Sequence, residues 1–290
     1  MRFEKERYTP YTTVSGVFVC EEEMGEIGSV RVFLDGGVIH YGPVDSFESY
    51  VSGNIRYIAF TSHGFSMALS QNQPKPGLSF SVSLDGLMTS NIVLPNVTWE
   101  ENTQTAGYIF VKENSSMWDA VVALCRKLNG GYPYISGANE VRFTRESDFV
   151  TNVYKESAVK WGYGSSYTGM VSHYHMKDTE DNYSINYENP TAVQREIVRH
   201  KYINLDRQWL DNGEEGLHHK SKFAAKGYRY SFIKYAGRAG EDIRRLVTYD
   251  GQIAGQDFGV KEVSRLRIDY GKNGLFTTLW FYEDEYAQNS

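Results

Sequence analysis

Residues 114–131 read NSSMWDAVVALCRKLNGG, and this stretch is the clearest helical signal in the chain. Ser116, with Asp119 three residues later, forms a capping-box start that satisfies amide donors without partners inside the helix. The adjacent glycines Gly130 and Gly131 supply a positive-φ stop. Between these signals, apolar residues recur at helical spacing: Met117, Val121, Leu124, Cys125 and Leu128. We therefore predict one amphipathic helix over residues 116–128.

A lone helix cannot bury this apolar stripe by itself, so it must pack on a sheet formed by other parts of the chain. The helix is followed by residues 132–135, YPYI, and by a short predicted strand within residues 140–143. We interpret the helix as a core element without chemistry of its own.

The composition limits the classes of function. A length of 290 residues suits one large or two medium domains. With 30 basic and 36 acidic residues the net charge is −6, which argues against a protein that grips duplex nucleic acid through a basic face. The same charge allows a surface that DNA merely slides past. The chain contains 22 tyrosines, 15 phenylalanines and 27 glycines, a composition typical of a β-rich protein.

The two cysteines, Cys20 and Cys125, are interpreted as small buried hydrophobes rather than as a disulfide or a metal pair. Five of the first seven residues are charged, and this segment lacks the apolar core of a signal peptide. No apolar run approaches the roughly 20 residues of a membrane span. We expect a soluble protein made in a cytoplasm.

The first 105 residues are predicted to form successive strands. They fall at residues 14–20, 29–34, 38–41, 55–61, 78–84 and 92–99. Turn sequences separate them at residues 35–37, 52–54, 74–77 and 85–86. Short strands at such regular spacing favour an antiparallel barrel or sandwich.

The remainder of the chain divides into two further units. Residues 106–150 contain a strand at 108–111, the capped helix and a strand at 141–143, and are too small for a core of their own. From residue 151 strands return, at 152–154, 158–163, 170–176, 228–235, 245–249, 260–269 and 275–282. The polar region 179–225 is expected to hold a loop and one helix at 214–226, and residues 272–274 to form a hairpin turn.

Few residues suggest chemistry. His173 and His175 lie on one face of a predicted strand and could ligate a metal with Asp178 or Glu180, but a third ligand has no compelling position. The adjacent His218 and His219 point in different directions on a predicted helix. The acidic runs 21–23 and 283–285 are typical of solvated faces. The glycine-rich residues 237–240 are interpreted as a loop because no phosphate-binding helix follows them.

Arg265 and Arg267 alternate with Leu266 and Ile268, so the two arginines share one face of a strand. A charged outer face and a partner-docking face both remain open. We assign no catalytic, cofactor-binding or metal-binding residue.

The order of the elements carries a resemblance. Residues 38–47 (VIHYGPVDSF), 58–69 (IAFTSHGFSMAL) and 72–77 (NQPKPG) resemble the opening β-barrel of baseplate hub proteins in contractile-tail phages and PBSX-like prophages. The capped helix with residues 132–135 looks like the next, small domain of that family. The stretch from residue 222 to residue 282 is similar to its second barrel, entered from a helix.

The resemblance implies a mainly β protein with two antiparallel tube-like barrels, at residues 1–105 and 151–290, joined by an αβ connector at 106–150, with an inserted loop and helix at about 179–226. It implies a homotrimeric ring that adapts a hexameric tail tube to a trimeric spike. Implied partners are the tail tube, spike and tape measure proteins. DNA would pass through the lumen without specific binding. The implied location is the baseplate of a virion tail assembled in the bacterial host cytoplasm.

Two alternatives remain. Aromatic residues could stack on sugar rings in a glycan-binding or carbohydrate-active β protein, the candidates being Tyr132, Tyr134, Trp161 and Tyr163. That interpretation lacks the paired carboxylates of a glycosidase. A metal-dependent hydrolase using His173 and His175 is the third possibility.

Overall fold

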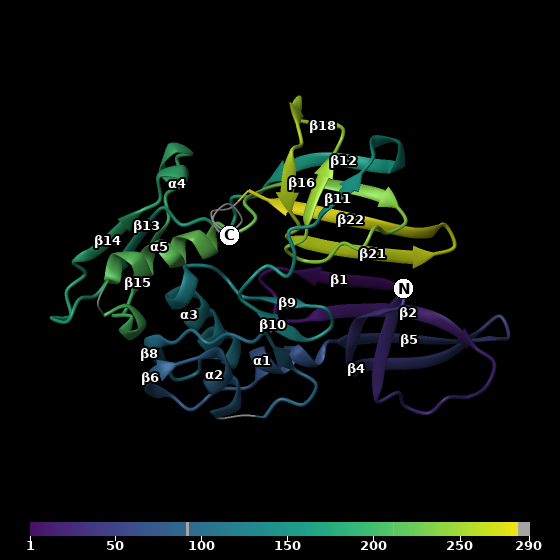
Figure 1. The fold of residues 1–290 in the computed structure, drawn as a ribbon, viewed down its shortest axis with the longest axis horizontal. Coiled ribbons are helices and arrows are strands. Elements are labelled where there is room, and N and C mark those ends of the chain that lie inside the picture. Colours follow the sequence, from purple (N-terminus) through teal and green to yellow (C-terminus); the bar gives the residue numbers. More distant parts are fainter. Residues whose placement is uncertain (91–92, 211, 284–290) are drawn as a thin grey trace.

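The computed structural model describes residues 1–90, 93–210 and 212–283 (Figure 1). Strand accounts for 44% of the structure and helix for 18%, so the prediction of a mainly β protein is confirmed. None of the described helices has the length and apolar character needed to cross a membrane.

The dominant feature is one nine-stranded sheet to which both halves of the chain contribute. The order across the sheet is β12-β16-β22-β21-β1-β2-β5-β4-β3, and every pairing is antiparallel. The amino-terminal half supplies β1 (Arg2–Glu6), β2 (Thr12–Cys20), β3 (Ser29–Leu34), β4 (Gly37–Ser52) and β5 (Ile55–His63). The carboxyl-terminal half supplies β12 (Ala158–Ser165), β16 (Arg229–Ala236), β21 (Arg265–Gly271) and β22 (Gly274–Tyr282).

The two halves meet where β1 pairs with β21, a junction that we call the seam. Figure 1 shows these two strands side by side although they come from opposite ends of the chain. Across the seam, Arg2 lies opposite Asp269 and Lys5 lies opposite Leu266. In the described part of the chain, backbone pairing closes neither half into its own barrel, so the expectation of two separate tube-like barrels is not confirmed.

One hydrophobic core spans the seam. It combines Phe3, Val14 and Ile39 with residues of the other half such as Leu266 and Phe281. Further strands of that half supply core residues: β11 (Val150–Val153) and β17 (Leu246–Tyr249), which pair with each other, while β20 (Val260–Glu262) pairs with β17. Because each half buries apolar area against the other, the seam is held by packing as well as by backbone hydrogen bonds.

A second core forms around the capped helix, α3 (Met117–Asn129). Ser116 and Asp119 make the predicted capping box, and Gly130 has a φ of 69°. Met117, Val121, Leu124 and Cys125 are buried, as the apolar stripe predicted. The surrounding elements are α1 (Ala68–Gln71), α2 (Leu84–Ser90), β6 (Gly77–Val82), β7 (Thr98–Trp99), β8 (Ala106–Val111), β9 (Tyr134–Ser136) and β10 (Glu140–Arg142).

Two local predictions near this core are wrong. The expected turn at residues 85–86 lies inside α2, because Leu84, Leu87 and Met88 have helical spacing and are all buried. The expected strand at 92–99 is reduced to the two residues of β7, and its first residue lies outside the described residues. For α2, burial of these side chains against neighbouring elements decided the local structure.

The polar region forms a small lobe. The predicted helix is confirmed as α5 (Gly213–Ala224), and the strand predicted at 170–176 is present over residues 173–176 as β13 (His173–Met176). The sequence did not predict α4 (Pro190–Gln194), nor β14 (Ile185–Glu188) and β15 (His200–Ile203), which form a three-stranded sheet with β13. The parallel pairing of β15 with β13 has no local sequence signature. Short elements complete the fold: η1 (Phe65–Met67), η2 (Lys155–Ser157), η3 (Arg207–Trp209), β18 (Gln252–Ile253) and β19 (Gln256–Asp257).

Candidate functional site: the seam and the free edges of the sheet

The outer face of the seam is charged. Leu266 and Ile268 are 2% and 1% exposed and point into the core, so Arg265 and Arg267 lie on the opposite face, as predicted. Arg265 Nη2 lies 3.2 Å from Glu4 Oε2, and Arg267 Nε lies 3.0 Å from Asp269 Oδ2. Both guanidinium groups also lie near the Trp280 ring, at 4.9 and 5.5 Å from its centroid.

One carboxylate on this face serves two arginines. Asp269 Oδ1 accepts a hydrogen bond of 2.9 Å from Arg2 Nε, while its other oxygen faces Arg267. Burial alone would raise the pKa of Asp269, but the Arg2 hydrogen bond and the charges of Arg267, Arg2 and Lys234 lower it. The carboxylate is therefore held in its charged form.

A broad groove of about 850 Å³ lies on the same face, beside the turn that joins β21 to β22. Its charged side chains are four cations, Arg2, Lys234, Arg267 and Lys272, and the single carboxylate of Asp269. The protein carries a net charge of −6, so this groove is a local concentration of positive charge.

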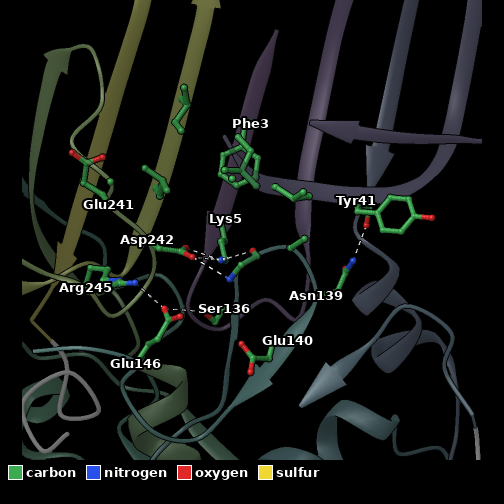
Figure 2. A pocket seen from close by; sticks show the side chains of 18 of the residues that line it. Phe3, Lys5, Tyr41, Ser136, Asn139, Glu140, Glu146, Glu241, Asp242 and Arg245 are labelled. Carbon is green, nitrogen blue, oxygen red and sulfur yellow. Dashed lines mark hydrogen bonds and ion pairs between the residues drawn. The ribbon is translucent and has the colours of Figure 1, made fainter. Parts of the chain in front are cut away.

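The inner side of the seam contains a cavity of about 530 Å³ (Figure 2). Lys5 points into it from β1 and is 3% exposed. Its Nζ donates to Asp242 Oδ1 at 2.6 Å and to the Gly137 carbonyl at 2.9 Å. Asn139 Nδ2 donates to the Tyr41 carbonyl at 2.9 Å. The loop between β9 and β10 is therefore tied to β1 and β4, two strands of the amino-terminal half of the sheet.

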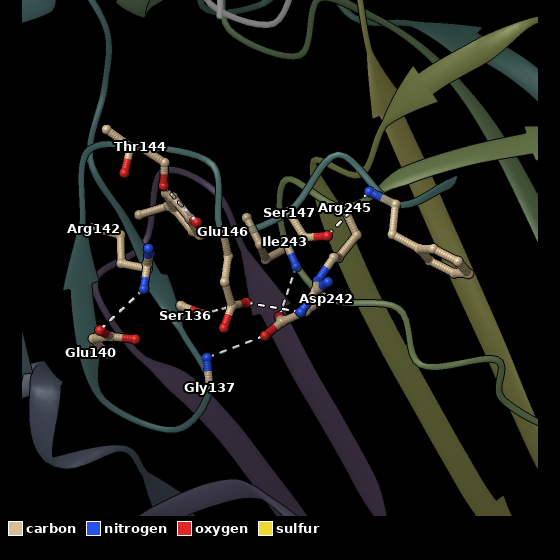
Figure 3. Close-up of polar contacts among 12 residues, drawn as sticks. Ser136, Gly137, Glu140, Arg142, Thr144, Glu146, Ser147, Asp242, Ile243 and Arg245 are labelled. Carbon is tan, nitrogen blue, oxygen red and sulfur yellow. Dashed lines mark hydrogen bonds and ion pairs between the residues drawn. The ribbon is translucent and has the colours of Figure 1, made fainter. Parts of the chain in front are cut away.

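Further polar contacts fix this β9–β10 hairpin (Figure 3). Glu146 Oε2 accepts from Arg245 Nη2 at 3.0 Å and from Ser136 Oγ at 3.3 Å. Asp242 accepts from the Gly137 amide at 3.2 Å and, through Oδ1, from the Ile243 amide at 2.7 Å. These contacts bind the hairpin to the 238–245 loop, so the glycine-rich residues 237–240 belong to a structural joint between strands.

A buried ionic cluster lies deeper in the same joint. The Glu262 side chain is 6% exposed and faces Arg7 Nη1 at 2.6 Å, Arg244 Nε at 3.1 Å and Arg145 Nε at 3.6 Å. Burial lowers the pKa of Arg244, and the adjacent Glu262 opposes that shift. Sequence analysis missed this cluster because its members come from four separate segments.

The two ends of the nine-stranded sheet expose unpaired strand edges. At one end β12 exposes Val159, Trp161 and Tyr163, which are 59%, 41% and 68% accessible. At the other end β3 pairs with residues 37–43 of β4, and the Val44 amide donates to the Gly28 carbonyl, so residues 45–52 of β4 have β5 as their partner on one side. Free edges of this kind are templates for pairing with another chain.

The histidine pair on β13 acquires a third member. His200 lies opposite His173 on β15, their rings are parallel with centroids 4.4 Å apart, and His200 Nδ1 lies 2.9 Å from His175 Nε2. Asp178 is instead used within a turn, where it accepts from the Glu180 and Asn182 amides. In the described chain no set of three or more His, Cys, Asp or Glu side chains is placed to hold a metal.

Several other residues considered in the sequence analysis are buried or packed against neighbouring side chains. His219 is buried, and burial lowers its pKa to about 3. Tyr132 and Tyr134 are 4% and 1% exposed, so the expectation that they stack on sugar rings is wrong. His218 packs near Tyr187.

Cys125 is buried and Cys20 is partly exposed, both as free thiols. Residues 21–23 are exposed as expected, while residues 284–285 of the second acidic run lie outside the described residues.

No family model and no curated protein match the chain. A tail protein from Neisseria meningitidis MC58 superposes with a TM-score of 0.71 at 13% identity, over 99% of this chain and 93% of that one. The 43 kDa tail protein of prophage MuSo2 from Shewanella oneidensis superposes with a TM-score of 0.70 at 11% identity, over 97% and 93%.

A third similar structure is a component of the Escherichia coli type VI secretion system, described as structurally similar to the T4 tail proteins gp27 and gp5. It superposes with a TM-score of 0.55 at 7% identity, over 99% of this chain and 74% of that one. The fold therefore defines the class: the chain has the fold of phage and prophage tail proteins. Within that class it has the fold of the gp27/gp5-like baseplate hub proteins, which confirms the resemblance at the level of the fold.

Proposed function

We propose that this chain is the hub subunit of a phage-tail or tail-like baseplate, a structural protein that forms a homotrimeric ring. The ring joins a hexameric tail tube to a trimeric spike and meets the tape measure protein, and DNA passes through its centre. The chain acts in the virion tail baseplate after assembly in the bacterial host cytoplasm. We assign it no catalytic role.

The observation that carries this proposal is the continuous nine-stranded sheet across the seam. Each half of the chain contributes an antiparallel run of strands, so one chain presents two comparable units side by side. Three such chains in a ring would present six units to a hexameric tube while keeping threefold symmetry toward a spike. The tail-protein fold supports the same assignment.

The free edges supply a mechanism for closing the ring. A head-to-tail contact generates a ring when its rotation closes. The edge of β12 in one copy can pair with residues 45–52 of β4 in the next, which covers these two unpaired stretches of strand. The charges on the two edges are complementary, since Lys160 lies on β12 and Glu48 on the exposed part of β4.

The division into units at residues 105 and 150 also remains a proposal. Tyr8, Leu69, Leu84 and Val97 share the core of α3 rather than the core that spans the seam. Residues of the first unit thus contribute to the core of the connector, and we propose that the two move as one body.

Shape and oligomeric state test the hub assignment. We expect analytical ultracentrifugation and negative-stain electron microscopy to show a three-copy ring with a central channel, either alone or after addition of a spike or tube protein. A chain that stays monomeric at high concentration and with both partners contradicts the proposal.

Charge reversal tests the edge contact. Lys160→Glu and Glu48→Lys should each weaken assembly through like-charge repulsion across the contact, and the double variant should restore it. Lys75→Glu, at an exposed loop position, is the matched control. Rings that form equally well in both single variants place the contact elsewhere, while leaving the hub assignment intact.

A further inference from the structure

The groove on the outer face of the seam has a charge opposite to that of the whole protein. Of the charged side chains that line it, four are basic and one is acidic. We propose that this groove contacts the phosphate backbone of double-stranded DNA. The inference rests on the proposed hub function and adds to it a defined place where DNA meets the wall of the channel.

The cations are spread over the face rather than focused on one point. Arg2 comes from β1, Lys234 from β16, Arg267 from β21 and Lys272 from the turn that follows it. A compact anion needs convergent donors, whereas a helical polyanion presents phosphates at intervals along its backbone. A groove of about 850 Å³ with dispersed cations fits the polymer better.

Asp269 organises the groove without neutralising it. Arg2 and Arg267 each use Nε toward this carboxylate, and a guanidinium carries four further N–H donors that can reach a phosphate. Lys234 lies over the Phe276 ring at 4.9 Å from its centroid. The carboxylate therefore fixes the orientation of two arginines while the groove keeps an excess of positive charge.

Few contacts and a negatively charged surrounding protein favour weak, salt-sensitive binding. Phosphate contacts release counterions, so affinity falls steeply with salt and carries no sequence information. Transient contact of this kind lets DNA move through a channel while keeping it centred. It agrees with the expectation that DNA passes without specific binding.

Fluorescence anisotropy with a short labelled DNA duplex tests the inference on the full chain. The wild type should bind at low salt and release the duplex as salt approaches physiological levels. Lys234→Gln with Lys272→Gln should weaken low-salt binding roughly tenfold and lower the slope of log affinity against log salt by about 0.9 for each lost contact. Neither lysine takes part in the Asp269 pairs, so the variant should fold normally.

The matched control is Lys75→Gln with Lys155→Gln, which removes the same charge from exposed positions outside the groove. If the control variant loses as much affinity for the duplex, the effect is one of net charge alone and the inference is overturned. Absence of wild-type binding at low salt overturns it as well. An acidic peptide such as poly-glutamate that binds as tightly as the duplex reassigns the groove to a polypeptide. Oligomeric state is measured separately: a ring that does not bind DNA rejects this inference alone, and a chain that never forms a ring rejects the hub function.

Discussion

Lys5 and Asp242 form an ion pair across the seam, with Lys5 Nζ 2.6 Å from Asp242 Oδ1, although 237 residues separate them in the chain. The Lys5 side chain is 2% exposed and that of Asp242 is 22% exposed. Asp242 also accepts hydrogen bonds from the Gly137 and Ile243 amides, so a single carboxylate joins β1, the β9–β10 hairpin and the loop before β17. The joint between the two halves is thus specific as well as hydrophobic.

Asp242→Asn should destabilise the protein by about 3–5 kcal/mol, because it leaves the Lys5 ammonium buried without its counter-ion. Urea unfolding measures the change. Arg2→Gln breaks the Arg2–Asp269 pair, where the Arg2 side chain is 53% exposed, and should cost less than about 1 kcal/mol. Equal losses of unfolding free energy in the two variants would contradict a stabilising role for the buried Lys5–Asp242 ion pair.

Gly42 lies where β4 passes close to the end of β5. A Cβ at this position would meet the His63 carbonyl oxygen at 1.8 Å and the Gly64 Cα at 2.9 Å, so backbone would have to move. We expect Gly42→Ala to destabilise the protein by about 3 kcal/mol or more, at the upper end of overpacking costs. Gly107→Ala is the control, since nothing lies within 4 Å of its added Cβ. Thermal melts compare the two, and a normal melt for Gly42→Ala counts against the close approach.

His40 is fully buried, and burial lowers its pKa to about 4. Its neutral form is satisfied: Thr12 Oγ1 lies 2.7 Å from Nδ1, and Ser62 Oγ, which donates to the Pro43 carbonyl, lies 2.8 Å from Nε2. The folded-state pKa is below the unfolded value of about 6.5, so protons favour the unfolded chain. The contribution of neutral, buried His40 to the free energy of unfolding is therefore complete above about pH 6.5 and is lost as the pH falls toward 4.

The unfolding free energy should therefore fall by about 1.2 kcal/mol for His40 between pH 6 and pH 5. His219, with a pKa lowered to about 3, acts in the same direction. His40→Gln should remove about half of the combined slope, measured by urea unfolding at several pH values. An unchanged slope in His40→Gln refutes the assignment.

Ser116→Ala tests the cap of α3. Ser116 Oγ accepts from the Asp119 amide at 3.1 Å, and Asp119 Oδ2 accepts from the Ser116 amide at 2.8 Å. Loss of the cap should cost about 1 kcal/mol in unfolding free energy. Ser115→Ala, one residue before the cap, should have little effect. The same cost at both positions argues against the capping box.

Local signals in the sequence were sufficient for much of the secondary structure. The α3 cap, the apolar stripe and the turns at 35–37, 52–54 and 272–274 depend on residues close in the chain, and all appear in the structure. The alternation at Arg265 and Arg267 predicted which face of β21 is charged. In contrast, α2 was not predicted because Asp85 and Gly86, which lie inside it, were interpreted as a turn.

The candidate surfaces were mostly beyond sequence reasoning. The groove at the seam collects cations from residues 2, 234, 267 and 272, and the Glu262 cluster collects arginines from residues 7, 145 and 244. His200 joins His173 and His175 through a parallel pairing that no local motif announces. Such groups of residues cannot be predicted from the sequence because their members are far apart in the chain and form no regular motif.

The sequence by itself determined the mainly β class, the capped helix, the hairpin turns and the order of elements that resembles a baseplate hub, because each depends on short-range periodicity, capping or turn chemistry. Only the tertiary structure decided that β1 pairs with β21. That pairing converts two expected barrels into one continuous sheet, and it places the basic groove on one face and the buried Lys5 on the other. Strand pairing across more than 250 residues is chosen by the total apolar area buried and by satisfaction of backbone hydrogen bonds, which are properties of the whole fold.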